Sequence, residues 1–578
     1  MKRFFVKLIM IICSYQSYGQ SDMQINFVGN QDDLSILDKA KLLNKKIDSV
    51  QIQFFLKRAL SDLHKRGYLQ ARFNILDLKD DIVDVHVEAG KVYKLARLDR
   101  GNLNEEIINK VGYKEKFYSD RPFNHHQVAL LMQKVLDISE NQGYPFASIQ
   151  LDSISLVQNI LRASLNYDPG PFITFDSLEV AGDAKLKEGF LTSYLRIIPG
   201  EPFDMRKIEN VDAKLNRLPY LDKNKTGHLT FQNTQSTLHL EIDHKRVNQI
   251  DGIVGFLPNE TDDGKLLLTG EFNLALYNLF SSGKGLQFNW QKLKKFSQFL
   301  RANYYHPNLF RSPVNLDFTF ELLKEDTTFI NRSLGFELSY EGGVYSRFKF
   351  FSKIRNTSLL SAATLRNVNE LPDFLDSEVN AYGIGYEWNN LDDPFNPLRG
   401  FRGLIEADVG NKKIKRNANI NSSLYDGVEL TSIQLVSSFA LENYARLSQR
   451  LVLRSKISGG KIFNDRLFLN DLFRIGGLKS LRGFNENFFF ASDYLIANVE
   501  LRLLLDRASY LLIFYDQAHL RKRLDNIIDK DNPYGLGVGL NFSTNAGIFS
   551  FIYALGNSRQ QAFGFDSSKI HFGYISRL

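Results

Sequence analysis

From about residue 248 to the C-terminus, apolar and polar side chains alternate with a period of two. In the segment 494–504, for example, Leu495 and Val499 fall on one face of a strand, and Glu500 falls on the other. Sixteen such runs can be counted in this half of the chain. The pattern fits a soluble sandwich with its polar face outside, or a membrane barrel with its apolar face outside. The large number of runs, together with the export signal described below, favours the barrel, and an even number lets the strands close with no free edge.

The segments between these runs predict where the long connections lie. Residues 357–378, 410–427, 460–493 and 519–532 each follow an odd-numbered run. If the N-terminal half of the protein is periplasmic, the first strand runs outward, and connections after odd-numbered strands face the cell exterior. These four segments are therefore predicted to be external loops.

The first half of the chain has a different pattern, in which amphipathic helices alternate with short strands. A helix, a tyrosine and two strand-like runs recur in order, and Tyr68, Tyr144 and Tyr220 are each 76 residues apart. A fixed period of this length indicates repeated modules. We place three modules at 23–90, 91–169 and 170–246, before a barrel at 247–578.

Residues 1–19 have the pattern of an export signal. Lys2 and Arg3 precede an apolar centre, and Ser17 and Gly19 are small residues at the positions that a signal peptidase reads. We expect cleavage after Gly19. The alternative is a lipid anchor on Cys13, the single cysteine of the chain. With cleavage, the mature protein would contain neither a disulfide nor a thiol nucleophile.

Composition narrows the class of protein. Aromatic residues make up 13% of the chain, charged residues make up 24%, and the mean hydropathy is −0.24. These values exclude a disordered chain and disfavour a helical membrane protein. The formal charge of +7 falls to +4 when the three basic residues of 1–19 are removed. This excess is too small to indicate nucleic-acid binding, so no nucleic-acid partner is expected.

The sequence contains no pattern that indicates an enzyme. A His-Glu-x-x-His motif, a Gly-x-Ser-x-Gly motif and a phosphate-binding glycine loop are all missing from it. Adjacent His125 and His126 begin a predicted helix and would not converge on one metal ion. We therefore predict a protein that is not an enzyme, with no catalytic residue, no metal site and no cofactor.

One motif stands out in the longest predicted external loop, between the eleventh and twelfth strands. It contains a diglycine followed by an Arg-Gly-Phe tripeptide, in the order Gly476, Gly477, Leu481, Arg482, Gly483 and Phe484. The same tripeptide recurs at 399–401, where it lies in a predicted periplasmic turn. We interpret that second copy as turn chemistry.

Repeated α+β modules, a 16-stranded barrel and this loop motif together resemble the POTRA-plus-barrel proteins of the BamA and TamA type, the bacterial surface antigen superfamily. The resemblance implies a fold of α+β periplasmic POTRA repeats followed by an all-β 16-stranded transmembrane barrel. It also implies that Arg482 folds back into the lumen, where Asp516 is the first candidate partner, with Phe514 and Glu500 next. Ala518 departs from the family pattern Phe-x-Asp-x-Gly on that strand.

Elementary electrostatics agrees with this expectation. A guanidinium in a narrow polar lumen is poorly hydrated and needs a carboxylate, preferably in bidentate geometry. The alternative is a solvated loop arginine, with Asp516 as an ordinary acidic residue of the lumen.

The closing seam between the first and last strands is the second candidate site. Gly252 and Gly255 weaken the first strand, and Gly573 and Tyr574 lie in the last one. An open seam would offer unpaired backbone groups to an incoming client strand by β-augmentation. The alternative is a seam that stays shut around a static pore.

The resemblance implies an outer-membrane protein of a Gram-negative bacterium, with its N-terminal modules in the periplasm, that inserts or translocates client proteins through a lateral gate. The alternatives are a polypeptide exporter of the two-partner-secretion type and a passive channel with docking domains. The expected partners are unfolded outer-membrane or surface proteins, a periplasmic or inner-membrane assembly partner bound by the modules, and outer-membrane lipid.

Overall fold

The computed structural model describes residues 22–43, 46–48, 51–79, 82–258, 266–292, 296–360, 365–366, 368–506, 508–524, 527–544 and 547–577. The predicted signal segment 1–19, with Cys13, lies outside these residues. The chain forms two compact units. One unit extends to Phe175 and includes Gly200–Arg206 and Gln232–Ser236, and the other unit contains the remainder.

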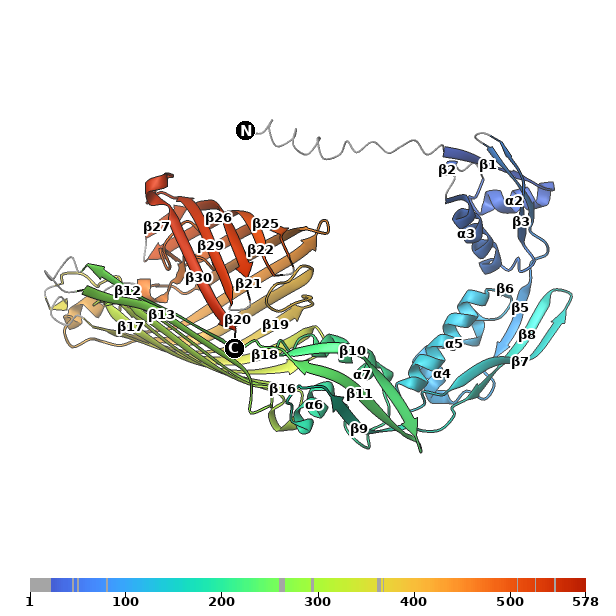
Figure 1. The fold of residues 1–578 in the computed structure, drawn as a ribbon, viewed down its shortest axis with the longest axis horizontal. Helices are drawn as coiled ribbons and strands as arrows, with labels where there is room; N and C mark the ends of the chain where they lie inside the picture. The colour runs from blue at the N-terminus through green and yellow to red at the C-terminus, as the bar shows by residue number, and fades with distance from the viewer. Residues whose placement is uncertain are drawn as a thin grey trace. The chain divides into compact units, whose positions relative to one another are not determined.

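The first module is a four-stranded sheet with two helices (Figure 1). Its strand order is β2-β1-β4-β3, with β1 parallel to β4. The alternation in β4 buries Val83, Val85 and Val87 against Leu56 and Leu63 of α3. Its elements are β1 (Asp22–Val28), α2 (Gln31–Lys39), β2 (Lys46–Asp48), α3 (Ile52–Lys65), β3 (Arg72–Lys79) and β4 (Ile82–Glu88).

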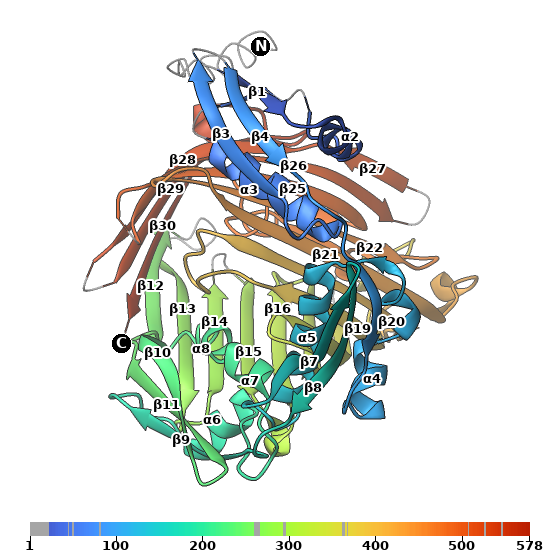
Figure 2. The ribbon, with the colours of Figure 1, turned by 90° about the vertical axis from the view of Figure 1, so that its right-hand side faces the viewer.

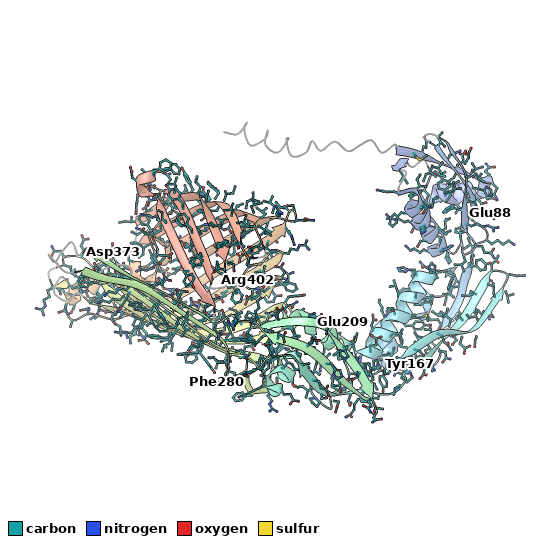
Figure 3. All side chains as sticks on the ribbon, in the orientation of Figure 1. Glu88, Tyr167, Glu209, Phe280, Asp373 and Arg402 are labelled. Carbon is teal, nitrogen blue, oxygen red and sulfur yellow. The ribbon has the colours of Figure 1, made fainter. Side chains whose placement is uncertain are left out.

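The second module repeats this arrangement with the strand order β6-β5-β8-β7. Asn104 and Asn124 cap the starts of its two helices, and the hydroxyl of Tyr167 lies 2.8 Å from that of the buried Ser139 (Figure 3). Its elements are β5 (Lys94–Asp99), α4 (Glu105–Val111), η2 (Glu115–Phe117), β6 (Arg121–Pro122), α5 (His125–Glu140), β7 (Ser148–Val157) and β8 (Ile160–Asp168).

The third module has a three-stranded sheet of order β10-β11-β9 within the described residues. Asn233 and Thr234 both have positive φ values, which suits the tight turn between β10 and β11. Its elements are β9 (Thr174–Ala181), α6 (Glu188–Leu195), α7 (Met205–Glu209), α8 (Val211–Leu215), β10 (Leu221–Gln232) and β11 (Gln235–His244).

The alternating half of the chain forms a closed antiparallel barrel, as the sequence predicts (Figure 2). Among the described residues, seventeen strand segments fill sixteen positions, because β27 and β28 both pair with β26 at different heights. The segments are β12 (Gln249–Pro258), β13 (Leu266–Leu279), β14 (Lys284–Lys292), β15 (Gln298–His306), β16 (Val314–Glu325), β17 (Phe329–Glu341), β18 (Ser346–Leu359), β19 (Ser377–Asn389), β20 (Gly400–Ile414), β21 (Thr431–Arg446), β22 (Leu451–Phe463), β25 (Asp493–Leu504), β26 (Tyr510–Leu524), β27 (Ile527–Asp531), β28 (Tyr534–Ser543), β29 (Ile548–Asn557) and β30 (Lys569–Arg577).

Two of the predicted external loops are partly wrong. Residues 519–532 are largely strand, because β26 continues to Leu524 and pairs with β27. Strand β20 similarly runs on to Ile414. In this part of β26 the exposed positions hold His519 and Arg521 instead of apolar residues, so the apolar half of the alternation is missing and the sequence carried no strand signal there. Among the described residues, no helix is long and apolar enough to cross a membrane.

Strand alternation sorts the side chains between lumen and outer surface. In β25, Leu495, Val499 and Leu503 are exposed on the outer face, whereas Glu500 and Arg502 are buried inside. The lumen next to this wall is therefore lined by charge and needs internal counterions.

Two glycines in the second module differ in how closely another backbone segment approaches them. Gly101 and Gly112 both have positive φ, but a Cβ at Gly101 would collide with the carbonyl oxygen of Leu165, whereas Gly112 faces open space. We expect Gly112→Ala to cost about 1–2 kcal/mol. Gly101→Ala should cost several kcal/mol more. Hydrogen exchange of α5 in the full-length protein measures the difference, and equal protection in the two variants would contradict it.

Candidate functional site

The predicted motif lies in the connection 464–492, which we call loop six. Its base is a short hairpin of β23 (Phe473–Ile475) and β24 (Phe489–Ala491). Gly476, Gly477 and Gly483 all adopt positive φ, so the glycines of the motif occupy backbone conformations that other residues rarely adopt.

Arg482 is buried against the lumen wall. Its Nε donates to Asp516 Oδ2 at 2.8 Å, and a second guanidinium nitrogen donates to Asp516 Oδ1 at 2.7 Å. A third donates to Glu500 Oε2 at 2.7 Å. The guanidinium also lies 3.6 Å from the ring centroid of Phe514. Arg482 is 4% exposed and Asp516 is fully buried, so the structure brings together all four residues that the sequence analysis named.

Glu500 connects this pair to a larger network. It accepts hydrogen bonds from Arg502 at 2.6 Å and from Arg454 at 3.4 Å, and Arg454 donates to Glu442 at 2.7 Å. Three guanidinium groups thus face three carboxylates, counting Arg482 and Asp516. The arrangement balances charge inside the wall and ties the loop to β25 and β26, so it can act as an anchor.

The remaining residues of the motif pack into apolar surroundings. Leu481 and Phe484 are fully buried in a cluster with Ala518 of β26. The family pattern has glycine where this chain has Ala518. Here the alanine methyl is part of the packed surface, and the loop still approaches closely.

Sequence reasoning missed three glycines of the wall. A Cβ at Gly535 of β28 would collide with the carbonyl oxygen of Arg482, and a Cβ at Gly556 of β29 would lie 2.6 Å from that of Gly483. Gly537 leaves room in the same way for the ring of Phe514. Glycine inside a strand is a known sign of close backbone approach, so the signal was present in the sequence.

The sequence analysis also missed an anchor at the start of loop six. The buried Asp471 forms ion pairs with Lys412 of β20 and with Arg355 of β18. Next to it, Asn470 donates to the carbonyl oxygen of Leu375 at 3.4 Å. Loop six is therefore held at its base as well as at Arg482. Lys412 lies in a segment that the sequence analysis assigned to an external loop, so the sequence did not indicate that Lys412 and Arg355 would meet Asp471.

The predicted seam is short. Strands β12 and β30 pair only at Gln249 with Arg577 and at Ile250 with Ser576 among the described residues. By contrast, β12 pairs with β13 along all of Gln249–Pro258. The register of the seam, if continued, would place Gly252 opposite Tyr574.

The other gate residues pair with neighbours on their own side of the seam. Gly252 pairs with Phe272 and Gly255 with Thr269, whereas Gly573 pairs with Ser550 and Tyr574 with Phe549. The ladder therefore stops before it reaches any of the four residues that the sequence analysis named.

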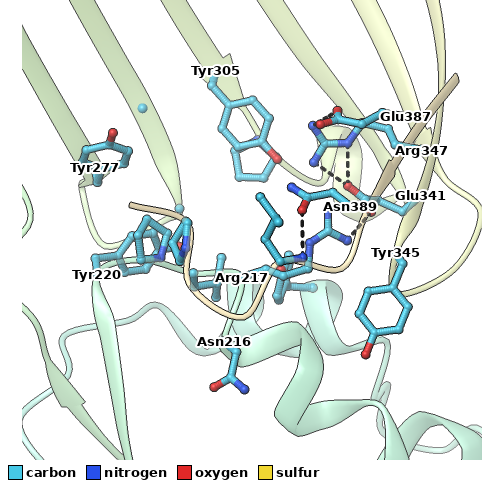
Figure 4. Close-up of a pocket in the computed structure, with 18 of the residues that line it drawn as sticks. Asn216, Arg217, Tyr220, Tyr277, Tyr305, Glu341, Tyr345, Arg347, Glu387 and Asn389 are labelled. Atoms are coloured by element: carbon cyan, nitrogen blue, oxygen red, sulfur yellow. Dashed lines mark hydrogen bonds and ion pairs between the residues drawn. The ribbon is translucent and has the colours of Figure 1, made fainter. Parts of the chain in front are cut away.

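The third module docks on the barrel at the turn between β17 and β18 (Figure 4). Glu341 accepts hydrogen bonds from Arg347 at 2.9 and 3.0 Å and from Asn315 at 3.0 Å within the barrel. Arg217 of the third module donates to the same carboxylate at 3.4 Å, and Arg196 donates to the carbonyl oxygen of Glu341 at 2.9 Å. Glu341 is thus a shared anchor for module and wall.

Residues near this contact enclose a cavity of about 620 Å³ at the barrel mouth. Tyr220 and Asn216 of the module face Tyr277, Tyr305 and Arg347 of the barrel across it. Polar and aromatic groups of both parts line the cavity, and their charges are largely paired. It can hold water or an extended peptide segment.

A small hydrogen-bond network in the third module holds the end of α6 beside this cavity. Lys214 donates from Nζ to the carbonyl oxygens of Tyr194 and Leu195, at the end of α6, at 3.2 and 3.1 Å. Burial lowers the pKa of Lys214 to about 8 and raises the pKa of Tyr194 to about 12. Tyr194 therefore stays protonated, and its hydroxyl donates to the carbonyl oxygen of Lys214 at 3.1 Å.

We expect Arg482→Ala to destabilise the barrel by about 3–5 kcal/mol, because it leaves the buried Asp516 without its bidentate counterion and removes one of the three arginines around Glu500. Thermal unfolding in detergent and protease cleavage within loop six measure the effect. Arg559→Ala is the matched control, since the Arg559–Asp529 pair is 67% and 52% exposed, and it should cost at most about 1 kcal/mol. Equal stability of the two variants would contradict the anchor.

We expect Glu341→Gln to loosen the third module on the barrel, because Arg217 of the module loses its charged acceptor. The cost should be about 1–3 kcal/mol, visible as faster hydrogen exchange in α6 with unchanged exchange in the barrel strands. Glu209→Gln, at an exposed position of α7 (Figure 3), is the control and should leave this exchange unchanged. Unchanged exchange in Glu341→Gln would show that the carboxylate is not the anchor.

Comparison with known proteins identifies the family. Residues 278–574 match the model of the Omp85 superfamily domain. No curated protein matches the chain at a significant level. Among solved structures, CdiB from Escherichia coli is 12% identical, with 95% of this chain and 99% of that chain covered and a TM-score of 0.54. CdiB from Acinetobacter baumannii is 13% identical, with coverage of 92% and 100% and a TM-score of 0.53.

BamA from Haemophilus ducreyi lacking POTRA domains 1–3 also matches, at 13% identity, with coverage of 84% and 99% and a TM-score of 0.40. The CdiB structures show that the fold is shared along most of the chain. The resemblance drawn from the sequence is confirmed. Because the family match spans more than half of the residues of the chain, the protein belongs to the Omp85 superfamily of outer-membrane β-barrels with periplasmic POTRA domains.

Proposed function

We propose that this protein inserts or translocates client proteins at the outer membrane, with the seam between β12 and β30 as a lateral gate. The observation that carries the proposal is the length of that seam, which is two residue pairs. The neighbouring ladder between β29 and β30 extends from Ile548 with Ile575 to Ala554 with Lys569. Opening the seam therefore breaks far fewer backbone hydrogen bonds than opening any adjacent ladder.

The free edge of β12 supports a templating role. Beyond Ile250, within the part of the chain that the structure describes, β12 is paired on its β13 side but not on its β30 side. Its N–H and C=O groups on that edge can accept an extended client strand by β-augmentation. In lipid such groups must find partners, so an arriving strand gains hydrogen bonds that no solvent supplies.

Loop six supports the gate without blocking it. Its Arg482 binds β25 and β26, and its backbone approaches β28 and β29. These contacts stiffen the half of the barrel that ends at β30. We propose that Gly476, Gly477, Leu481, Arg482, Gly483 and Phe484 hold this half rigid while the other side of the seam moves.

The three N-terminal modules are proposed to be POTRA repeats at 23–90, 91–169 and 170–246. Each has sheet edges to which an extended peptide can add, as at β7, where Ile154, Leu156 and Val157 are exposed. These edges suit unfolded clients or a periplasmic or inner-membrane assembly partner. The role requires no catalytic residue or cofactor.

A disulfide across the seam tests the gate. The variant Gly252→Cys with Tyr574→Cys places two cysteines at positions that would lie opposite each other if the register of the seam continued. When oxidised, it should stop assembly of other outer-membrane barrels in cells depleted of the wild-type protein, and reduction should restore it. The amounts of folded barrels in the outer membrane are the measurement.

The matched control is Gly252→Cys with Phe272→Cys, because these residues are already paired in the β12–β13 ladder. Locking that ladder should leave assembly unchanged. Normal assembly with a locked seam would refute the lateral gate. Loss of one secreted substrate, with all barrels assembled normally, would favour the polypeptide exporter instead.

A further inference from the structure

A row of charged side chains crosses four neighbouring strand segments of the outer wall. Lys461 of β22 is the register partner of Asp493 in β25, Asp493 is the partner of Arg521 in β26, and Arg521 is the partner of Lys530 in β27. Neighbouring strands lie about 4.8 Å apart, so the row spans roughly 15 Å. We call these four residues the charged row.

The charged row points away from the lumen. In β26 the even-numbered positions from Tyr510 to Leu520, among them Phe514 and Asp516, are buried, whereas Ile513, Tyr515 and Arg521 are exposed on the opposite face. Lys461 and Lys530 are exposed as well. Arg521 therefore shares its face with the apolar side chains that meet lipid.

The row has an excess of positive charge. Lys461 Nζ lies 3.5 Å from Asp493 Oδ1, and this pair compensates itself. Arg521 and Lys530 have no carboxylate within 4 Å in the part of the chain that the structure describes. Two uncompensated cations thus lie side by side on adjacent strands.

The row lies toward the external ends of its strands. It lies at the ends of β22 and β26 that lead to the external loops, above the apolar outer residues Leu495, Val499 and Leu503 of β25. A cation on the lipid face is costly at the bilayer midplane but costs close to nothing near the interface. The row is therefore placed where charge can meet lipid headgroups.

A groove joins the cations to an apolar floor. Its cavity of about 740 Å³ is lined by Ile405, Phe439 and Leu495 and, at its rim, by Arg521 and Lys530. An apolar floor beneath cations complements a molecule with an acyl chain and a phosphate. An acidic protein would complement the cations but would leave the floor without a partner.

We propose that this groove binds a phosphate-bearing lipid of the outer leaflet, with the phosphate on Arg521 and Lys530 and an acyl chain on Ile405, Phe439 and Leu495. The inference rests on the membrane orientation given in the proposed function, but not on the lateral gate or on any client. Such binding would fix the height of β25–β27 in the membrane, on the side of the barrel that loop six stiffens.

The test is native mass spectrometry of the full-length protein in neutral detergent, titrated with diphosphorylated lipid A and with the same lipid after removal of both phosphates. The wild-type protein should prefer the phosphorylated lipid. Arg521→Gln with Lys530→Gln should weaken that binding roughly thirtyfold and abolish the preference. Asp493→Asn should strengthen it, because the one anion of the row is removed.

The control is Arg72→Gln with Lys110→Gln, which removes the same charge from exposed positions of the first two modules and should leave lipid binding unchanged. Retained heat-modifiable migration of every variant shows that the barrel is folded. Equal affinity of wild type and the Arg521, Lys530 double variant, or equal binding of the lipid with and without phosphate, would overturn the proposal. Assembly with the locked seam is a separate measurement, so either proposal can fail alone.

Discussion

Backbone hydrogen bonding in lipid is the constraint on which the rest of this structure depends. Every N–H and C=O group at membrane depth needs a partner within the protein, so a sheet can cross the bilayer only as a closed barrel. Here the ladders run along nearly whole strands, from β12 with β13 around to β29 with β30. The exception is the two-pair seam at Gln249 and Ile250. The proposed lateral gate is therefore the place in the barrel where backbone pairing is least complete.

Closing a barrel of sixteen positions creates a second problem, because the lumen is too wide for wall side chains alone to fill it. Loop six fills part of it and brings Arg482 to Asp516 and Glu500. A buried ion pair of this kind is weak evidence for stability by itself, but it is specific in geometry. The bidentate contact, the packed Leu481 and Phe484 and the glycines of β28 and β29 together define one position for the loop.

At the mouth of the barrel, too, one charged group binds partners from two parts of the chain. Glu341 belongs to a turn of the wall, yet the arginines that bind it come from the barrel and from the third module. One carboxylate thereby couples the position of the module to the wall. The cavity beside it is lined by both parts, so its shape depends on how the module docks.

Sequence alone determined the architecture, because period-two alternation records which face of each strand meets lipid. The same logic placed Glu500 on the polar face of its strand, whereas the resemblance implied that Arg482 folds back and that Asp516 and Phe514 are its partners. The glycines Gly535 and Gly556 were also readable in the sequence, although they were missed.

Other features were decided only by the tertiary structure. The pairing of Asp471 with Lys412, the shared anchor at Glu341 and the alignment of Lys461, Arg521 and Lys530 each join residues that are far apart in the chain. Alternation tells which face a side chain occupies, but not its height relative to other strands or which loop returns to meet it. Register and loop closure set those distances, and both depend on how the whole barrel closes.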